Sequence, residues 1–120
     1  MPLIVIHTNL PQADIGSEQL RNVSTGSAEI LGVEPKIVQV VINAGSPMMF
    51  GGTEEPTAMA FVHSAGGKLK QEANDEFSAK FTDLIVKSIG VPKERIYMLL
   101  DDVPQSSACY MGLTIASLTH

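Results

Sequence analysis

The order strand, helix, strand occurs twice in this chain, and this repeat limits the possible folds more than any other feature. Residues 4–8 (IVIHT) parallel residues 60–64 (AFVHS), 56 positions further on. Residues 31–33 (LGV) likewise parallel residues 89–91 (IGV). Self-similarity of this kind predicts two copies of one βαβ unit.

Hydrophobic patterns predict the elements of each copy. Apolar, largely β-branched runs at residues 3–8, 37–42, 57–64 and 96–100 are typical of strands. Apolar residues at helical spacing predict one helix that ends at Gly32 and a second that ends at Gly90. A short apolar piece at residues 113–118 predicts an edge strand near the end of the chain.

These elements predict an α/β fold, or α+β in some schemes, with two βαβ repeats in one domain. The domain spans residues 1–120, with repeat 1 at about 2–50, repeat 2 at about 51–101 and a tail at 102–120. Because βαβ crossovers are right-handed in nearly all cases, both helices should cover one face of a four-stranded sheet. The second and fourth strands are almost continuously apolar, which is typical of strands buried on both faces. We therefore expect copies of the chain to cover the other face.

Charge and composition exclude several classes of partner. The chain has 8 Lys and Arg against 13 Asp and Glu, a net charge of −5, which disfavours nucleic acid and anionic lipid. No apolar run approaches the roughly 20 residues of a membrane span. No basic segment precedes an apolar one, as it would in a secretory signal. We therefore expect a cytoplasmic protein without membrane insertion.

No metal ion or cofactor is expected from the residue types available. Cys109 is the single cysteine, so a Cys-only zinc site is excluded. His7 and His63 occupy equivalent strand positions, where packing roles are expected, and His120 is terminal. The glycine pairs lie outside a phosphate-loop pattern.

The start of the chain supplies a potential catalytic amine. Methionine is normally removed before proline, which would leave Pro2 as an N-terminal secondary amine. An α-amino group has a pKa of about 8 in water, and burial beside apolar strands lowers that pKa. The neutral amine can then serve as a general base or a nucleophile. A retained Met1 would convert the same nitrogen into a non-basic amide.

Four separated motifs occur in a fixed order along the chain. They are residues 2–9 (PLIVIHTN), 50–56 (FGGTEEP), 63–67 (HSAGG) and 91–97 (VPKERIY). Together they resemble the macrophage migration inhibitory factor (MIF) family of the tautomerase superfamily, in register from Met1 to about Tyr110. The resemblance implies a homotrimer whose sheets form a central barrel. It also implies a keto–enol tautomerase acting on phenylpyruvate- or dopachrome-type substrates.

By position, the resemblance also implies roles for single residues. Pro2 would be the catalytic base. The backbone of Ser64 and Ala65 would contact substrate. Tyr97 would enter the pocket from the neighbouring subunit, and Tyr110 would occupy the place of the usual tryptophan.

Two departures from the family pattern change the expected pocket. Val33 stands where the family has the lysine that holds an anionic substrate, and Leu99 stands where it has an asparagine. Losing a charge-assisted contact to a carboxylate costs about 1.5–3 kcal/mol. We therefore expect a more apolar pocket with weakened or altered activity, favouring an apolar ketone or an ester. Lys36 lies nearby at the entrance to the second strand and could reach inward.

Two other functions are compatible with the same fold. A cytokine-like ligand would bind a cell-surface receptor through the trimer surface, and MIF-family proteins can leave cells without a signal peptide. A catalytically silent trimer would hold a small apolar ligand in the residual pocket. Turnover that disappears in Pro2→Gly would distinguish the tautomerase from both.

Overall fold

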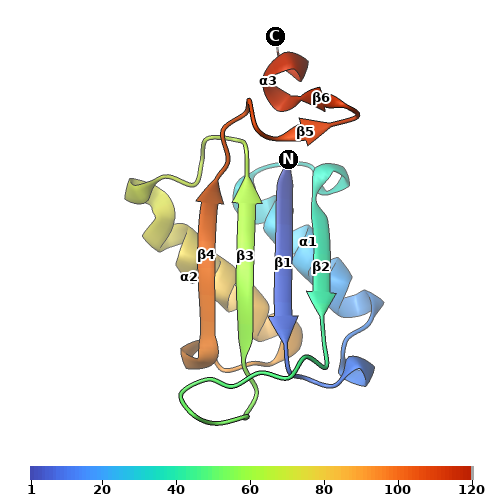
Figure 1. Ribbon diagram of the computed structural model, residues 1–120, viewed down its shortest axis with the longest axis vertical. Helices are drawn as coiled ribbons and strands as arrows, with labels where there is room; N and C mark the ends of the chain where they lie inside the picture. Colours follow the sequence, from blue (N-terminus) through green and yellow to red (C-terminus); the bar gives the residue numbers. More distant parts are fainter. Residues whose placement is uncertain (120) are drawn as a thin grey trace.

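A four-stranded sheet with two long helices behind it forms the body of the chain (Figure 1). The computed structural model describes residues 1–119. The strands are β1 (Pro2–Thr8), β2 (Gln39–Asn43), β3 (Ala58–Ser64), β4 (Ile96–Asp102), β5 (Cys109–Tyr110) and β6 (Leu113–Thr114). The helices are α1 (Ser17–Leu31), α2 (Gln71–Ile89) and α3 (Ile115–Leu118), with 3₁₀ turns η1 (Gln12–Asp14), η2 (Pro35–Ile37) and η3 (Lys93–Arg95).

The sheet topology confirms the two predicted βαβ units. The strand order is β2-β1-β3-β4. Strands β1 and β2 are parallel, β3 and β4 are parallel, and the central pair β1 and β3 is antiparallel. Both α1 and α2 lie on the same face, as Figure 1 shows. Within residues 1–119 the sheet stays open and does not close into a barrel.

Glycines determine where the helices end and how closely they pack. Gly32 and Gly90 cap α1 and α2 in the left-handed conformation, with φ of 67° and 81°, which confirms both predicted stops. Gly26 lies where α1 meets α2, and a Cβ there would be 2.4 Å from Leu84 Cδ1. Packing therefore explains a glycine in the middle of a helix. No helix within residues 1–119 is both long and apolar enough to cross a membrane.

The hydrophobic core lies between the helices and the sheet. Alternate residues of each strand point toward the helices, so Ile4 and Ile6 of β1 are almost completely buried. Phe81 and Ile85 of α2 meet them from the other layer. The core therefore comes from both repeats and joins them into one unit.

The opposite face of the sheet exposes large apolar side chains. The exposed fractions are 41% for Val41, 43% for Met59, 74% for Tyr97 and 64% for Leu99. The helices cover one face only, as predicted, so the other side of β2 and β4 is exposed in a single chain. A continuous apolar surface of this kind is typical of an interaction site.

The ends of two predicted strands differ from the sequence analysis. β2 begins at Gln39, because residues 35–37 form the turn η2, in which Val38 N donates to Pro35 O at 3.0 Å. The predicted edge strand at 113–118 is wrong. Only Leu113–Thr114 is extended, pairing with Cys109–Tyr110, and Ile115–Leu118 is helical. The reason is a local cap, since Ser117 N donates to Thr114 Oγ1 at 3.1 Å.

Truncating Phe81 should strongly destabilise the fold. Phe81 is 1% exposed in the core, and Phe81→Ala should lower the free energy of unfolding by about 3–5 kcal/mol. Met49 is 67% exposed, so Met49→Ala should change it by less than about 0.5 kcal/mol. Urea unfolding at one fixed protein concentration measures both. Equal effects of the two variants would contradict this description of the core.

Candidate functional site

Pro2 lies at the end of the sheet where β1 begins and β3 ends. Its ring is buried, and it faces Ser64 across the antiparallel pair. Ser64 and Ala65 are 5% and 2% exposed. The Ser64 carbonyl accepts a hydrogen bond from Val103 N at 2.8 Å, which holds the exit from β4 beside it. The first strand residue is therefore rigidly placed.

A cavity of about 490 Å³ opens beside Pro2. Its walls come from the start of β1, from η2 and the start of β2, and from the tail. The lining residues are Met1, Pro2, Leu3, residues 36–39, Cys109, Tyr110 and Ile115. Most of these side chains are apolar, and the volume lies in the range of small-molecule sites, about 300–1,000 Å³.

The cavity disfavours a charged amine at the start of the chain. Burial lowers the pKa of the Met1 amino group below its ordinary value of 8.0. The physical cause is desolvation, because the ammonium form loses water that the apolar walls do not replace. A neutral amine can accept a proton at physiological pH.

Within one chain, the structure brings only some of the predicted site residues to this cavity. Pro2 and Tyr110 line it, and Ser64 lies opposite Pro2 with Ala65 directly after it. Tyr97 and Leu99 are elsewhere. Tyr97 lies opposite Met59 of β3, and Met59 lies opposite His7 near the other end of β1. Leu99 is aligned with the middle of the sheet. The Tyr97 ring packs against Phe50 at 5.0 Å between ring centroids.

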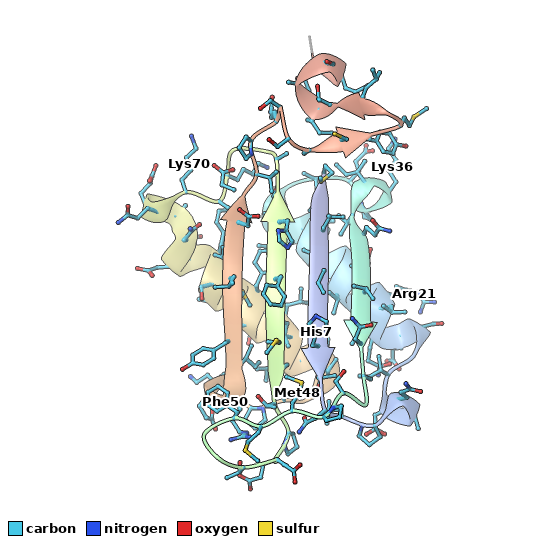
Figure 2. The ribbon with its side chains drawn as sticks, in the orientation of Figure 1. His7, Arg21, Lys36, Met48, Phe50 and Lys70 are labelled. Atoms are coloured by element: carbon cyan, nitrogen blue, oxygen red, sulfur yellow. The ribbon has the colours of Figure 1, made fainter. Side chains whose placement is uncertain are left out.

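Val33 lies against the core, whereas Lys36 lies on the wall of the cavity. Val33 is half-buried and packs against the core, and it does not belong to the residues in 1–119 that line the cavity. Lys36 does line it. Figure 2 shows Lys36 beside the tail hairpin, at the end of the sheet where the chain starts. The sequence alone left the direction of Lys36 open, because that direction depends on the turn η2.

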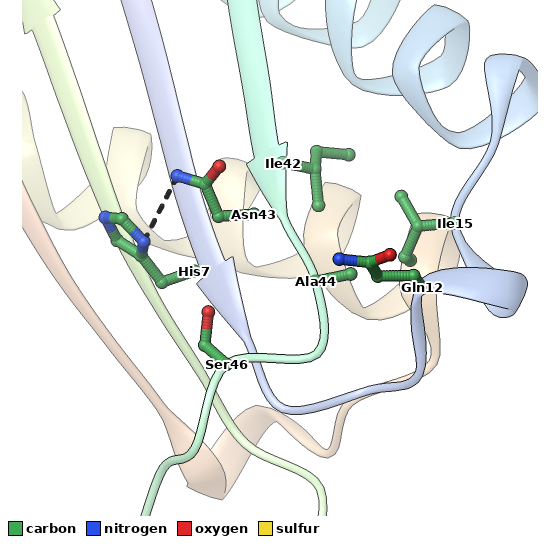
Figure 3. A pocket seen from close by; sticks show the side chains of 7 residues that line it. All are labelled: His7, Gln12, Ile15, Ile42, Asn43, Ala44 and Ser46. Atoms are coloured by element: carbon green, nitrogen blue, oxygen red, sulfur yellow. Dashed lines mark hydrogen bonds between the residues drawn. The ribbon is translucent and has the colours of Figure 1, made fainter.

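A second hollow, of about 620 Å³, lies at the other end of β1 (Figure 3). It includes His7, Gln12, Asn43 and Ser46 among its lining residues. His7 Nδ1 and Asn43 Nδ2 are 3.3 Å apart in a hydrogen bond. None of the predicted site residues belongs to it, so the cavity at Pro2 is the candidate active site.

One pair of ionisable side chains lies on the face of the sheet that the helices leave uncovered. His63 Nδ1 is 2.8 Å from Asp101 Oδ2, a contact that sequence analysis missed. The parallel register of β3 and β4 could have predicted it, since it places these two residues opposite each other. Residues 1–119 contain no group of three or more His, Cys, Asp and Glu side chains that could hold a metal ion. His120 lies outside the described residues.

Comparison with known proteins agrees with the fold. The family model described as macrophage migration inhibitory factor (MIF) matches residues 1–116. A MIF homolog from Brugia malayi is 33% identical over 114 residues, 95% of this chain and 98% of that protein. The solved structure of the MIF from Trichinella spiralis superimposes with a TM-score of 0.87 at 28% identity, covering 93% of this chain and 98% of the other.

Fold and sequence together define a mixed α+β protein of the tautomerase superfamily. The chain belongs to the MIF family. It is also 30% identical to D-dopachrome decarboxylase-B from Xenopus laevis over 98 residues, 82% of this chain and 83% of that protein. These relatives support an enzyme of the tautomerase or isomerase type.

Proposed function

We propose that this chain is a keto–enol tautomerase in which Pro2, after removal of Met1, is the general base. The observation that carries the proposal is the cavity at Pro2, which is largely apolar and lowers the pKa of an amine at the chain start. Its volume suits a phenylpyruvate- or dopachrome-type substrate. Membership of the MIF family supports the same reaction class.

The proposed reaction needs one base and a water-poor site. The neutral Pro2 nitrogen takes a proton from the carbon next to the substrate carbonyl, so a C–H bond breaks and an N–H bond forms. The released electron pair forms the C=C bond, which leaves an enolate. The prolyl ammonium then donates the same proton to the enolate oxygen, so its N–H bond breaks, the O–H bond of the enol forms and the base is restored. The reverse sequence converts enol to keto.

We also propose that the active unit is a homotrimer. The exposed apolar face gives the chain a reason to associate, since β2 and β4 each leave one side uncovered. Tyr97 and Leu99 lie on that face, away from the Pro2 of their own chain. A neighbouring copy would therefore supply both side chains to the pocket.

Changing Pro2 to glycine should remove most of the activity. Glycine replaces the ring-fixed secondary amine with an unconstrained primary amine, and loss of correct positioning of a general base typically lowers the rate by about 100- to 10,000-fold. We expect Pro2→Gly to lower kcat for phenylpyruvate by at least about 100-fold, with Met1 removal verified by intact mass. An alanine inserted between Met1 and Pro2 is the matched control, because it keeps the ring but makes its nitrogen an amide. This control should be equally inactive.

Unchanged turnover in either variant would contradict a role for Pro2 as base. A folded wild-type protein with a free Pro2 and no turnover would instead favour the silent binding trimer or the cytokine-like ligand.

The activity should rise with pH through a single ionisation. Because the neutral amine is the active form, kcat/KM should increase as the ammonium loses its proton. Burial favours the neutral form, so the midpoint should lie below about 8, the ordinary pKa of an α-amino group. Initial rates between pH 5 and 9, at constant ionic strength, measure it. A midpoint above 8 would show that the amine is solvated.

Adding a charge to the open face should break the trimer. Leu99 is 64% exposed on that face, and Leu99→Asp would place an unpaired carboxylate in the interface. We expect sedimentation equilibrium to give three times the chain mass of 12.8 kDa for the wild type and one chain mass for Leu99→Asp. Ala79→Asp, on an exposed position of α2, is the control and should stay trimeric. A monomeric wild type would contradict the proposed assembly.

A further inference from the structure

The cavity at Pro2 contains one charged side chain. Of the ten residues that line it, all within 1–119, only Lys36 carries a charge beyond the chain terminus. The neighbouring walls are apolar side chains such as Leu3, Val38 and Tyr110. Apolar walls with a single fixed polar group are typical of sites that bind a small organic molecule in one orientation.

The backbone holds Lys36 in place while its ammonium group stays available. Lys36 is the middle residue of η2, where Pro35 occupies the first turn and Ile37 N donates to Glu34 O at 3.2 Å. Its Nζ is 3.0 Å from Glu34 Oε2, and the two side chains are 78% and 70% exposed. An exposed pair of this kind is weak, so an incoming anion can replace Glu34.

Lys68, in the connection between β3 and α2, is already engaged. Lys68 Nζ donates to the carbonyl of Leu31, at the carboxyl end of α1. A cation at that position also interacts favourably with the helix dipole. Lys68 is therefore a structural residue, and Lys36 is the cation that faces the cavity.

We infer that Lys36 determines specificity by pairing with a carboxylate of the substrate, and that Glu34 competes with that carboxylate. The inference rests on the proposed function and names its substrate class, a small aromatic keto acid. The expectation of weakened binding to charged substrates followed from Val33 and Leu99. Val33 packs against the core, whereas Lys36 restores the positive charge from a different element.

Equilibrium binding tests this role without depending on turnover. The probes are 3-phenylpropionate, which has the carbon skeleton of phenylpyruvate without the keto group, and 3-phenylpropanamide, its uncharged analogue. Lys36→Met should raise the Kd for the acid about tenfold and leave the Kd for the amide unchanged. Glu34→Gln should lower the Kd for the acid about twofold, because it removes the competing carboxylate.

The pair Lys80–Glu76 on α2 offers matched controls, since its Nζ and Oε1 are 2.9 Å apart and also exposed. Lys80→Met and Glu76→Gln should change neither Kd. In parallel, Lys36→Met should raise KM for phenylpyruvate while kcat stays close to that of the wild type.

Each result decides the inference separately from the tautomerase proposal. Three results would overturn the inference. The first is the same Kd for the acid in wild type and Lys36→Met. The second is an equal loss of affinity for acid and amide, and the third is no binding of the acid to the wild type. Selective loss of acid binding supports it even if the wild type fails to turn over phenylpyruvate. That failure would count against Pro2 as catalytic base and leave Lys36 as the determinant of a binding site.

Discussion

The antiparallel pairing of β1 with β3 is the contact on which the rest of the structure depends. Seven residue pairs, from Pro2–Ser64 to Thr8–Ala58, join the first strands of the two βαβ units edge to edge. This pairing places both helices on one face and leaves the other open. It also brings the first strand residue beside the last residue of β3, so the cavity forms where the two repeats meet. A hydrogen bond from Thr8 Oγ1 to Thr57 O, 2.9 Å long and buried, closes the opposite end.

Two of the sequence motifs that carry the family resemblance prove to be partners in the fold. Arg95 of the fourth motif donates to four backbone carbonyls of the second, those of Phe50, Thr53, Glu55 and Pro56, at 2.9–3.4 Å. Its guanidinium also lies 5.2 Å from the centre of the Phe50 ring, which in turn packs on Tyr97. These residues therefore hold the loop before β3 against the start of β4. At this end of the sheet the shared motifs therefore support the architecture, and they fix the position of Tyr97, the residue proposed to enter the pocket of a neighbouring copy.

The repeat, the strands and the helix ends could be predicted because their signals are local: alternating apolar residues, helical spacing and a glycine at each helix end. The pairing of Pro2 with Ser64 could not be predicted in this way, because the repeat alone does not fix the order of the strands in the sheet. The position of Lys36 could not be predicted, because it depends on a 3₁₀ turn that directs a side chain toward a tail distant in sequence. The prediction of an extended strand over residues 115–118 was wrong for a related reason. A single capping threonine begins a helix there, and the short apolar run is too weak a signal to show it.

Apolar walls and the Lys36–Glu34 pair act on different parts of the proposed reaction. Burial disfavours the ammonium form of an amine at the chain start, so the walls keep the proposed base neutral and able to accept a proton. Lys36 Nζ and Glu34 Oε2 are 3.0 Å apart, so their charges offset each other while the site is empty. A substrate carboxylate that replaces Glu34 leaves this local charge balance unchanged. Recognition of the carboxylate would therefore change substrate binding and leave the basicity of the amine nearly the same. That recognition does not require the cation to occupy position 33; it requires a positive charge on the cavity wall, which η2 provides with Lys36.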